Sequence, residues 1–232
     1  MAIPLYLAKT AAEFATNAEQ PEKLAWMACH FSPYGTGLTN LPPQLPDGSL
    51  LILNDRTPVH GHDAKRIRET LEEAVTQLSC CGLLLDFQRP DCPETEIIVK
   101  ELLTLPCPVC VSDLYARELD CPIFLPPVPL TVPVEEYLSP WQGREIWLEA
   151  ATGCVSFTVT ENGCSVSPFQ QKGDFPFRDE RLHCHYRTEL RDDSAIFHVS
   201  RSKADLVALL EESSSFGVAK AVGLWQELER ID

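Results

Sequence analysis

The stretch CGLLLDFQRP, residues 81–90, is the part of the sequence that decides the fold. Its core, Gly82–Phe87, is short and apolar except for Asp86, as is typical of a strand buried on both faces of a parallel sheet. Because side chains alternate along a strand, Leu84, Asp86 and Gln88 share one face. The sequence therefore predicts a buried strand whose carboxyl end carries an acid and an amide toward the interior.

Seven further runs of this kind recur along the chain, with helical or turn segments between them. Alternation of short strands and helices predicts a parallel sheet built from βα units, and eight such units predict a (β/α)8 barrel. The expected strands are Ile3–Leu7, Ala25–Phe31, Ser49–Asn54, Gly82–Phe87, Pro108–Ser112, Cys121–Leu125, Glu145–Glu149 and Lys220–Trp225. We expect one barrel domain over residues 1–232, with a doubly wound open sheet as the alternative architecture.

The clearest helices in the sequence are Asp63–Ser79, Glu94–Leu105 and Lys203–Ser213. Asp63 is suited to cap the first of them. Residues 152–201 differ in texture, since alternating polar and apolar residues are separated there by the turn sequences ENG and RDD. This pattern predicts a four-stranded antiparallel insertion between the seventh and eighth barrel strands.

The formal charge of the chain is −15, from 34 acidic and 19 basic residues. Such a field repels phosphate backbones and anionic lipids, so neither nucleic acid nor a membrane is an expected partner. No export signal or run of roughly 20 apolar residues is found, and we expect a cytoplasmic location. Dinucleotide, P-loop and G-x-S-x-G motifs are missing from the sequence, so no cofactor is expected.

The ten cysteines lie mostly in apolar runs, which favours free, buried thiols over disulfides. Cys107 and Cys110 form a CxxC pair, but no second pair completes a metal site. No metal is therefore expected there.

Functional side chains of (β/α)8 barrels come from the carboxyl ends of the strands. Five acidic residues fall at or just after these ends, and they include Asp86 and Glu149, which extend the inward alternation of their strands. Capping of the following helices is an alternative explanation for Asp113 and Asp55. The candidate catalytic residues are Asp86, Glu149 and Glu227. The candidate ligand-binding residues are His30, Tyr34, Asp55, Arg56, Gln88, Asp113 and Trp225.

The stretch 81–90 also resembles the signature of the chitinase-like family-18 glycoside hydrolases, roughly D-G-x-D-x-D-[FW]-E-Y-P, in which Gly82, Asp86, Phe87 and Pro90 match. The family carries this segment on the fourth barrel strand, inserts a mostly β subdomain after the seventh, and ends the eighth with a tryptophan under the sugar. The resemblance implies the same places for Asp86, for the insertion and for Trp225.

The departures from the signature bear on activity. The resemblance places the acid that protonates the leaving oxygen at Gln88, and Cys81 and Leu84 replace two earlier aspartates. An amide cannot deliver a proton, so the family's usual hydrolysis is expected to be lost while a carbohydrate or similar polyhydroxylated ligand is still bound.

Two alternatives remain open at the level of sequence. The first is an active hydrolase that uses Asp86 with Glu149 or Glu227, or a divalent cation held by His30, Asp55 and Asp86 or Glu227. The second is a non-catalytic interaction protein that associates through an apolar patch of the insertion, at Val155–Val159 or Ile196–Val199.

Overall fold

The computed structural model describes residues 2–16, 20–34, 37–90, 92–168 and 173–229. Eight parallel strands close into a barrel in the order β1-β2-β4-β5-β6-β7-β8-β14, and β14 pairs back with β1. The barrel strands are β1 (Leu5–Lys9), β2 (Leu24–Phe31), β4 (Leu50–Asn54), β5 (Gly82–Asp86), β6 (Val109–Ser112), β7 (Ile123–Leu125), β8 (Ile146–Glu149) and β14 (Val218–Leu224). The predicted barrel is confirmed, and the closing pair β1–β14 excludes the open sheet.

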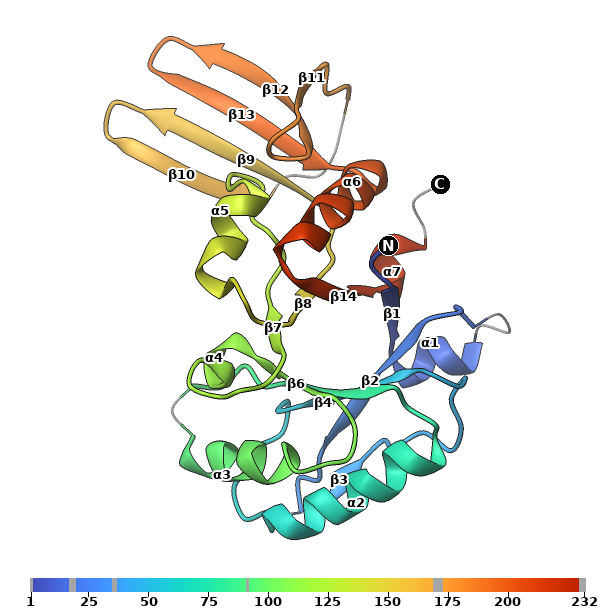
Figure 1. Cartoon of the computed structure of the whole chain (residues 1–232). Coiled ribbons are helices and arrows are strands. Elements are labelled where there is room, and N and C mark those ends of the chain that lie inside the picture. The colour runs from blue at the N-terminus through green and yellow to red at the C-terminus, as the bar shows by residue number, and fades with distance from the viewer. Residues whose placement is uncertain (1, 17–19, 35–36, 91, 169–172, 230–232) are drawn as a thin grey trace.

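Helices cover the outside of the barrel, as Figure 1 shows most clearly for α2 and α3. The helices are α1 (Ala11–Thr16), α2 (Ala64–Gln77), α3 (Pro93–Leu102), α4 (Asp113–Ala116), α5 (Val134–Leu138), α6 (Lys203–Ser213) and α7 (Trp225–Leu228). Asp63 caps α2 as predicted, because its side chain accepts hydrogen bonds from the backbone N–H groups of Lys65 and Arg66. A two-residue strand, β3 (Leu38–Thr39), pairs antiparallel with the outer end of β2.

A second, antiparallel sheet is inserted between β8 and β14 and stands to one side of the barrel (Figure 1). It has five described strands rather than the predicted four, because a short strand precedes the second hairpin. The strands are β9 (Gly153–Thr160), β10 (Gly163–Pro168), β11 (Phe177–Asp179), β12 (Cys184–Arg191) and β13 (Ser194–Arg201). Residues 169–172 of the predicted insertion lie outside the described residues.

The expected apolar patch of the insertion is only partly exposed. Val159 is 41% exposed, whereas Ile196 and Val199 are each 8% exposed and belong to the core. The largest apolar exposure on this sheet is that of Leu190, at 84%. Ile196–Val199 is therefore not an exposed apolar surface.

Two clusters of buried apolar side chains hold the barrel together. The larger fills the space between strands and helices, and includes Leu83, Leu85 and Phe87 of the decisive stretch. The smaller fills the barrel interior, and includes Leu84 and Trp147. A Cβ atom on Gly82 would lie 2.9 Å from Cη2 of Trp147, so the glycine leaves room for the indole in the barrel interior.

Candidate functional site

A cavity of about 890 Å³ opens at the carboxyl ends of the barrel strands. This is the end of a (β/α)8 barrel at which strand-end side chains and loops converge. Residues from all eight barrel strands, or from the segments that follow them, line it. The polar members of the lining are Thr10, His30, Asn40, Asn54, Asp55, Arg56, Asp86, Gln88, Arg89, Ser112, Asp113 and Glu149.

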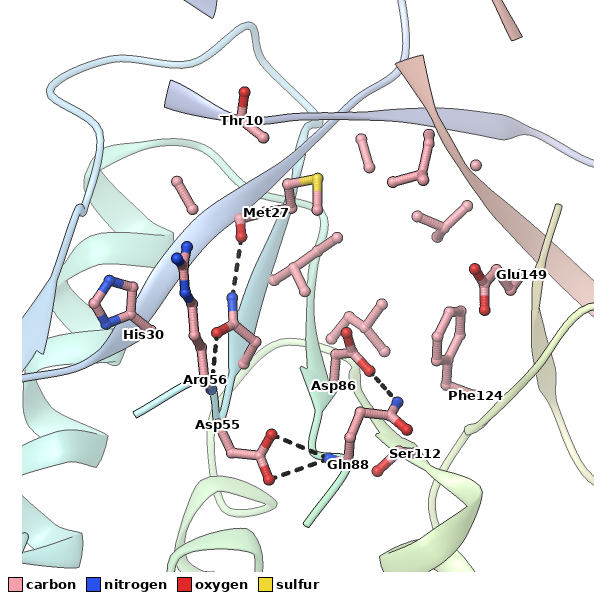
Figure 2. A pocket seen from close by; sticks show the side chains of 18 of the residues that line it. Thr10, Met27, His30, Asp55, Arg56, Asp86, Gln88, Ser112, Phe124 and Glu149 are labelled. Atoms are coloured by element: carbon pink, nitrogen blue, oxygen red, sulfur yellow. Dashed lines mark hydrogen bonds between the residues drawn. The ribbon is translucent and has the colours of Figure 1, made fainter. Parts of the chain in front are cut away.

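Asp86 and Gln88 both face this cavity, as the alternation along the fourth barrel strand predicts (Figure 2). The Gln88 side-chain amide donates a hydrogen bond of 2.5 Å to the Asp86 carboxylate. Burial raises the pKa of Asp86, the hydrogen bond from Gln88 lowers it, and the negative charge of Asp55 raises it. The net result is a pKa above the usual value, so Asp86 is an acid of weakened strength inside the cavity.

Asp55 fixes the backbone that carries Gln88. It is 4% exposed, and its carboxylate accepts hydrogen bonds from the backbone N–H groups of Gln88, at 3.1 Å, and Arg89, at 2.8 Å. It is not a helix cap, because Asp63 caps the following helix α2. Its carboxylate therefore joins the loop after β4 to the loop after β5. The sequence alone does not reveal this contact, because the two loops are far apart along the chain.

Glu149 ends the seventh barrel strand and faces the same cavity. Burial raises the pKa of Glu149, and the negative charges of Asp86 and Glu227 raise it further. Glu227 lies on α7 and is not among the described residues that line the cavity, and burial raises its pKa as well. Asp86 and Glu149 thus form a pair of interacting carboxyl groups, with Glu227 close enough to influence it.

His30 lines the cavity but already has hydrogen-bond partners. Its Nδ1 atom lies 2.9 Å from the backbone oxygen of Phe31, which only accepts, so Nδ1 carries the proton. Its Nε2 atom then accepts from the side-chain amide of Asn40 at 3.2 Å. These two contacts fix the orientation of the imidazole ring on the wall of the cavity.

Arg56 and Asp113 complete the predicted residues that line the cavity. Arg56 lies beside His30, on the other side of the cavity from Glu149 in Figure 2. Asp113 is the first residue of α4, and the N-cap position belongs to Ser112, so the helix-cap explanation for Asp113 is wrong. The Ser112 hydroxyl instead donates to the backbone oxygen of Phe87 at 2.8 Å, which ties β6 to the end of β5.

Neither aromatic residue that the sequence favoured for sugar stacking is among the described residues that line the cavity. Tyr34 is 87% exposed. The eighth strand ends at Leu224, so Trp225 begins α7 instead of ending the strand, and the ammonium group of Lys9 lies 3.7 Å from the centre of its ring. Both residues are aromatic and lie near an expected strand end. Because side chains alternate along a strand, an error of one residue in the position of that end turns the side chain away from the barrel interior.

Phe124 is the aromatic residue that the structure adds to the cavity. It lies on β7 and is 7% exposed, and Figure 2 shows its ring between Asp86 and Glu149 in that view. Sequence reasoning missed it because the sixth strand ends in the apolar residues Phe124 and Leu125, with no polar side chain to draw attention. Alternation along Cys121–Leu125 was the only available signal.

No group of three or more His, Cys, Asp or Glu side chains suited to a metal ion occurs in the described part of the chain. The site for a divalent cation that the sequence suggested, with His30, Asp55 and Asp86 or Glu227 as ligands, is therefore not assembled.

All ten cysteines are free, and Cys110 of the CxxC pair is buried in the barrel interior. The expectation that the thiols are buried holds for three of them, whereas Cys164 is exposed. No helix in the described ranges is long and apolar enough to cross a bilayer.

Comparison with known proteins finds similarity in the fold. No protein-family model and no curated protein matches the sequence. Among solved structures, a chitinase from Chromobacterium violaceum is 10% identical, with 96% of this chain and 93% of that chain covered and a TM-score of 0.53. A chitinase-like agglutinin from Robinia pseudoacacia is 11% identical, with 94% and 93% covered and a TM-score of 0.55.

The spore cortex-lytic enzyme SleL of Bacillus cereus is also similar, at 9% identity and a TM-score of 0.51, with 95% of this chain and 70% of that chain covered. At such identities a likeness speaks for the fold and not for the reaction. The chain therefore shares its barrel fold with chitinases and with a chitinase-like agglutinin.

Proposed function

We propose that the chain binds a carbohydrate or similar polyhydroxylated ligand in the cavity at the carboxyl end of its barrel, and that it lacks the hydrolytic route of the family-18 enzymes. The observation that carries the proposal is the pair Asp86–Gln88, which faces the cavity from the end of the fourth barrel strand. In the resemblance, the acid that protonates the leaving oxygen belongs at Gln88, and an amide has no proton to deliver.

Three features of the cavity support a sugar as the ligand. Its volume, about 890 Å³, suits a small oligosaccharide. Hydroxyl groups need both donors and acceptors, and the lining offers amides, hydroxyls and carboxylates from different strands. Phe124 adds an apolar ring face of the kind on which a sugar ring packs. The similar structures include both chitinases and an agglutinin, so the fold is compatible with either catalysis or binding alone.

Calorimetric titration with N-acetylglucosamine oligomers, preceded by a glycan-array screen, tests this proposal. Asp86→Ala and Phe124→Leu are expected to weaken binding at least tenfold, because each removes a direct contact. Asp47→Asn and Phe177→Leu are the corresponding controls, since Asp47 is exposed just before the amino end of β4 and Phe177 is half exposed on the insertion. If the folded wild-type protein binds no glycan, the proposal is wrong.

A second candidate function is hydrolysis by Asp86 and Glu149. The specific observation in its favour is the interaction of the two carboxyl groups, because the charge of Asp86 raises the pKa of Glu149. Burial raises the pKa of both groups, and a carboxyl group with a raised pKa is suited to donate a proton. This function predicts turnover of a chromogenic glycoside that disappears in Glu149→Gln.

A cytoplasmic location stays a prediction from the sequence.

A further inference from the structure

The carboxylates of the cavity lack positively charged partners. Among the described residues, no ion pair involves Asp86 or Glu149. The neighbouring charges that act on the two groups are those of Asp55, Asp86 and Glu227, and all of them are negative. Within the described part of the chain, the one hydrogen bond to either side chain comes from the neutral amide of Gln88. This side of the cavity therefore concentrates negative charge that no protein cation offsets.

The two arginines of the cavity lie elsewhere along its lining. Arg89 donates through its guanidinium group to the backbone oxygen of Arg56, at 2.7 Å. Figure 2 shows Arg56 beside His30, with Asp86 between it and the Phe124 and Glu149 side chains in that view. Neither arginine contributes to the pKa shifts of Asp86 or Glu149. The acidic side of the cavity is thus formed by Asp86 and Glu149, at the ends of β5 and β8, while the guanidinium groups come from the loops after β4 and β5.

We propose that the acidic side of the cavity, formed by Asp86 and Glu149 around the ring of Phe124, binds the ammonium group of an amine-bearing sugar, so that a glucosamine oligomer is preferred to its N-acetylated counterpart. This inference rests on the proposed function, and it specifies the ligand class of the same site. An ammonium group offers three donors and one positive charge to two carboxylates whose one donor, among the described residues, is the neutral Gln88 amide. An acetamido group offers one neutral donor, and leaves the two negative charges without compensation.

The proposal has a distinctive dependence on pH. Burial and mutual repulsion raise the pKa values of Asp86 and Glu149, so both groups take up protons at a higher pH than exposed carboxyl groups do. Affinity for the amine falls as the pH drops through these raised pKa values, because the carboxylates lose their charge. It falls again as the pH rises through the pKa of the sugar amine, because the ammonium group is lost. The N-acetylated ligand has no such amine and shows no loss at the alkaline side.

Isothermal titration calorimetry with two tetrasaccharides, one of glucosamine and one of N-acetylglucosamine, tests the preference directly. A charge-assisted hydrogen bond contributes about 1.5–3 kcal/mol, which corresponds to a preference of roughly tenfold to hundredfold for the amine. Trilysine serves as a cationic ligand without a sugar ring, since a protein of charge −15 attracts any cation over long distances. It is expected to bind more weakly than the glucosamine tetramer.

Glu149→Gln is the variant that assigns the preference to the cavity. It should weaken binding of the glucosamine tetramer about tenfold more than it weakens binding of the N-acetylated tetramer. Glu96→Gln removes the same formal charge from an exposed position on α3, and is expected to change neither affinity. The wild-type selectivity between the two tetramers decides the question even if the variant does not fold.

The outcomes separate this inference from the proposed function. If the N-acetylated tetramer binds as tightly as the glucosamine tetramer, or more tightly, the preference is refuted while carbohydrate binding stands. If trilysine matches the glucosamine tetramer, or if Glu149→Gln and Glu96→Gln behave alike, the attraction is unspecific and the inference fails. If neither tetramer binds, both the inference and the proposed function are overturned.

Discussion

Gln88, two positions beyond the end of the fourth barrel strand, donates a hydrogen bond from its side-chain amide to the carboxylate of Asp86, the last residue of that strand. The contact occurs inside a cavity, and Asp55 holds the Gln88 backbone in place from the neighbouring loop. A glutamine in this position orients and partly satisfies Asp86 without exchanging a proton with it. The arrangement suits recognition of a ligand more than protonation of one.

Glu149→Gln is expected to alter how stability depends on pH. Burial and the charges of Asp86 and Glu227 raise the pKa of Glu149 above its usual 4.5, so the folded protein binds this proton more tightly than the unfolded chain does. Stability from this group is fully present below pH 4.5 and is lost as the pH rises through the raised folded pKa. The variant should therefore be more stable than wild type at neutral pH, and equal to it in acid.

Thermal unfolding of both proteins, followed by circular dichroism from below pH 4.5 to neutral pH, measures this difference in stability. The exposed-site variant Glu96→Gln should follow the wild-type profile. Parallel pH profiles for wild type and Glu149→Gln would show that Glu149 carries no such penalty in the folded state.

Gly223→Ala is expected to destabilise the protein by about 2–3 kcal/mol, in the range for overpacked interiors. Gly223 lies on β14 at the cavity, where an added Cβ atom would fall 2.6 Å from the backbone oxygen of Ala150 on the neighbouring chain segment. Gly153→Ala is the control, because its Cβ atom would meet only Leu130, at 3.8 Å. That change should be neutral or stabilising by up to about 1 kcal/mol. Urea denaturation of both variants measures the difference, and equal effects would contradict it.

The barrel could be predicted from the sequence because each buried strand is a local apolar run bounded by polar residues. The exact ends of the strands and the number of strands in the insertion could not be predicted in this way. The first strand continues to Lys9, which is 0% exposed and lies against the Trp225 ring, and no hydrophobic pattern indicates a buried lysine. The extra strand of the insertion, β11, consists of Phe177–Asp179, and two exposed residues with one partly buried residue carry too short an alternation to be recognised.

Some residues of the candidate site likewise have a local signal in the sequence, whereas others are brought to the site only by the folded chain. Asp86 and Glu149 could be placed because each continues the alternation of its own strand, which is a local signal. The hydrogen bonds from the backbone of Gln88 and Arg89 to Asp55 join residues more than thirty positions apart, so only the folded chain shows them. Phe124 faces the cavity only because the sixth strand has a particular register, whereas Trp225 was placed by residue type alone.

Arg201→Met is expected to loosen the insertion from the barrel. Arg201 ends β13, is 4% exposed, and donates hydrogen bonds to the backbone oxygens of Val128, Leu182 and His183. Methionine fills a similar volume but leaves three carbonyl groups unpaired, at a cost of about 3 kcal/mol. Limited proteolysis should cleave the variant faster within residues 152–201. Arg191→Met, at an exposed position of the same sheet, should leave the cleavage rate unchanged. Equal rates for both variants would contradict the role assigned to Arg201.

Gln88→Glu tests whether the cavity retains the geometry of a glycoside hydrolase. The substitution places a second carboxyl group in contact with Asp86, because the Gln88 amide already lies 2.5 Å from it. Burial raises the pKa of Asp86, and two carboxyl groups in contact do not both ionise readily, so the pair is expected to hold a proton at a higher pH than an exposed carboxyl group does. That proton is the one the present amide cannot supply. General acid catalysis contributes about 10²–10⁴-fold, so we expect slow hydrolysis of a chromogenic N-acetylglucosaminide to appear in Gln88→Glu.

Gln88→Ala is the control, since it breaks the contact with Asp86 without adding an acid, and it should remain inactive. The rate should fall as the pH rises through the pKa of the shared proton, which distinguishes a restored acid from a contaminating enzyme. A folded Gln88→Glu protein with no more turnover than Gln88→Ala would show that the missing acid is not what separates this barrel from a hydrolase. Leu84, buried in the barrel interior where the family-18 signature has an aspartate, would then be the next position to change.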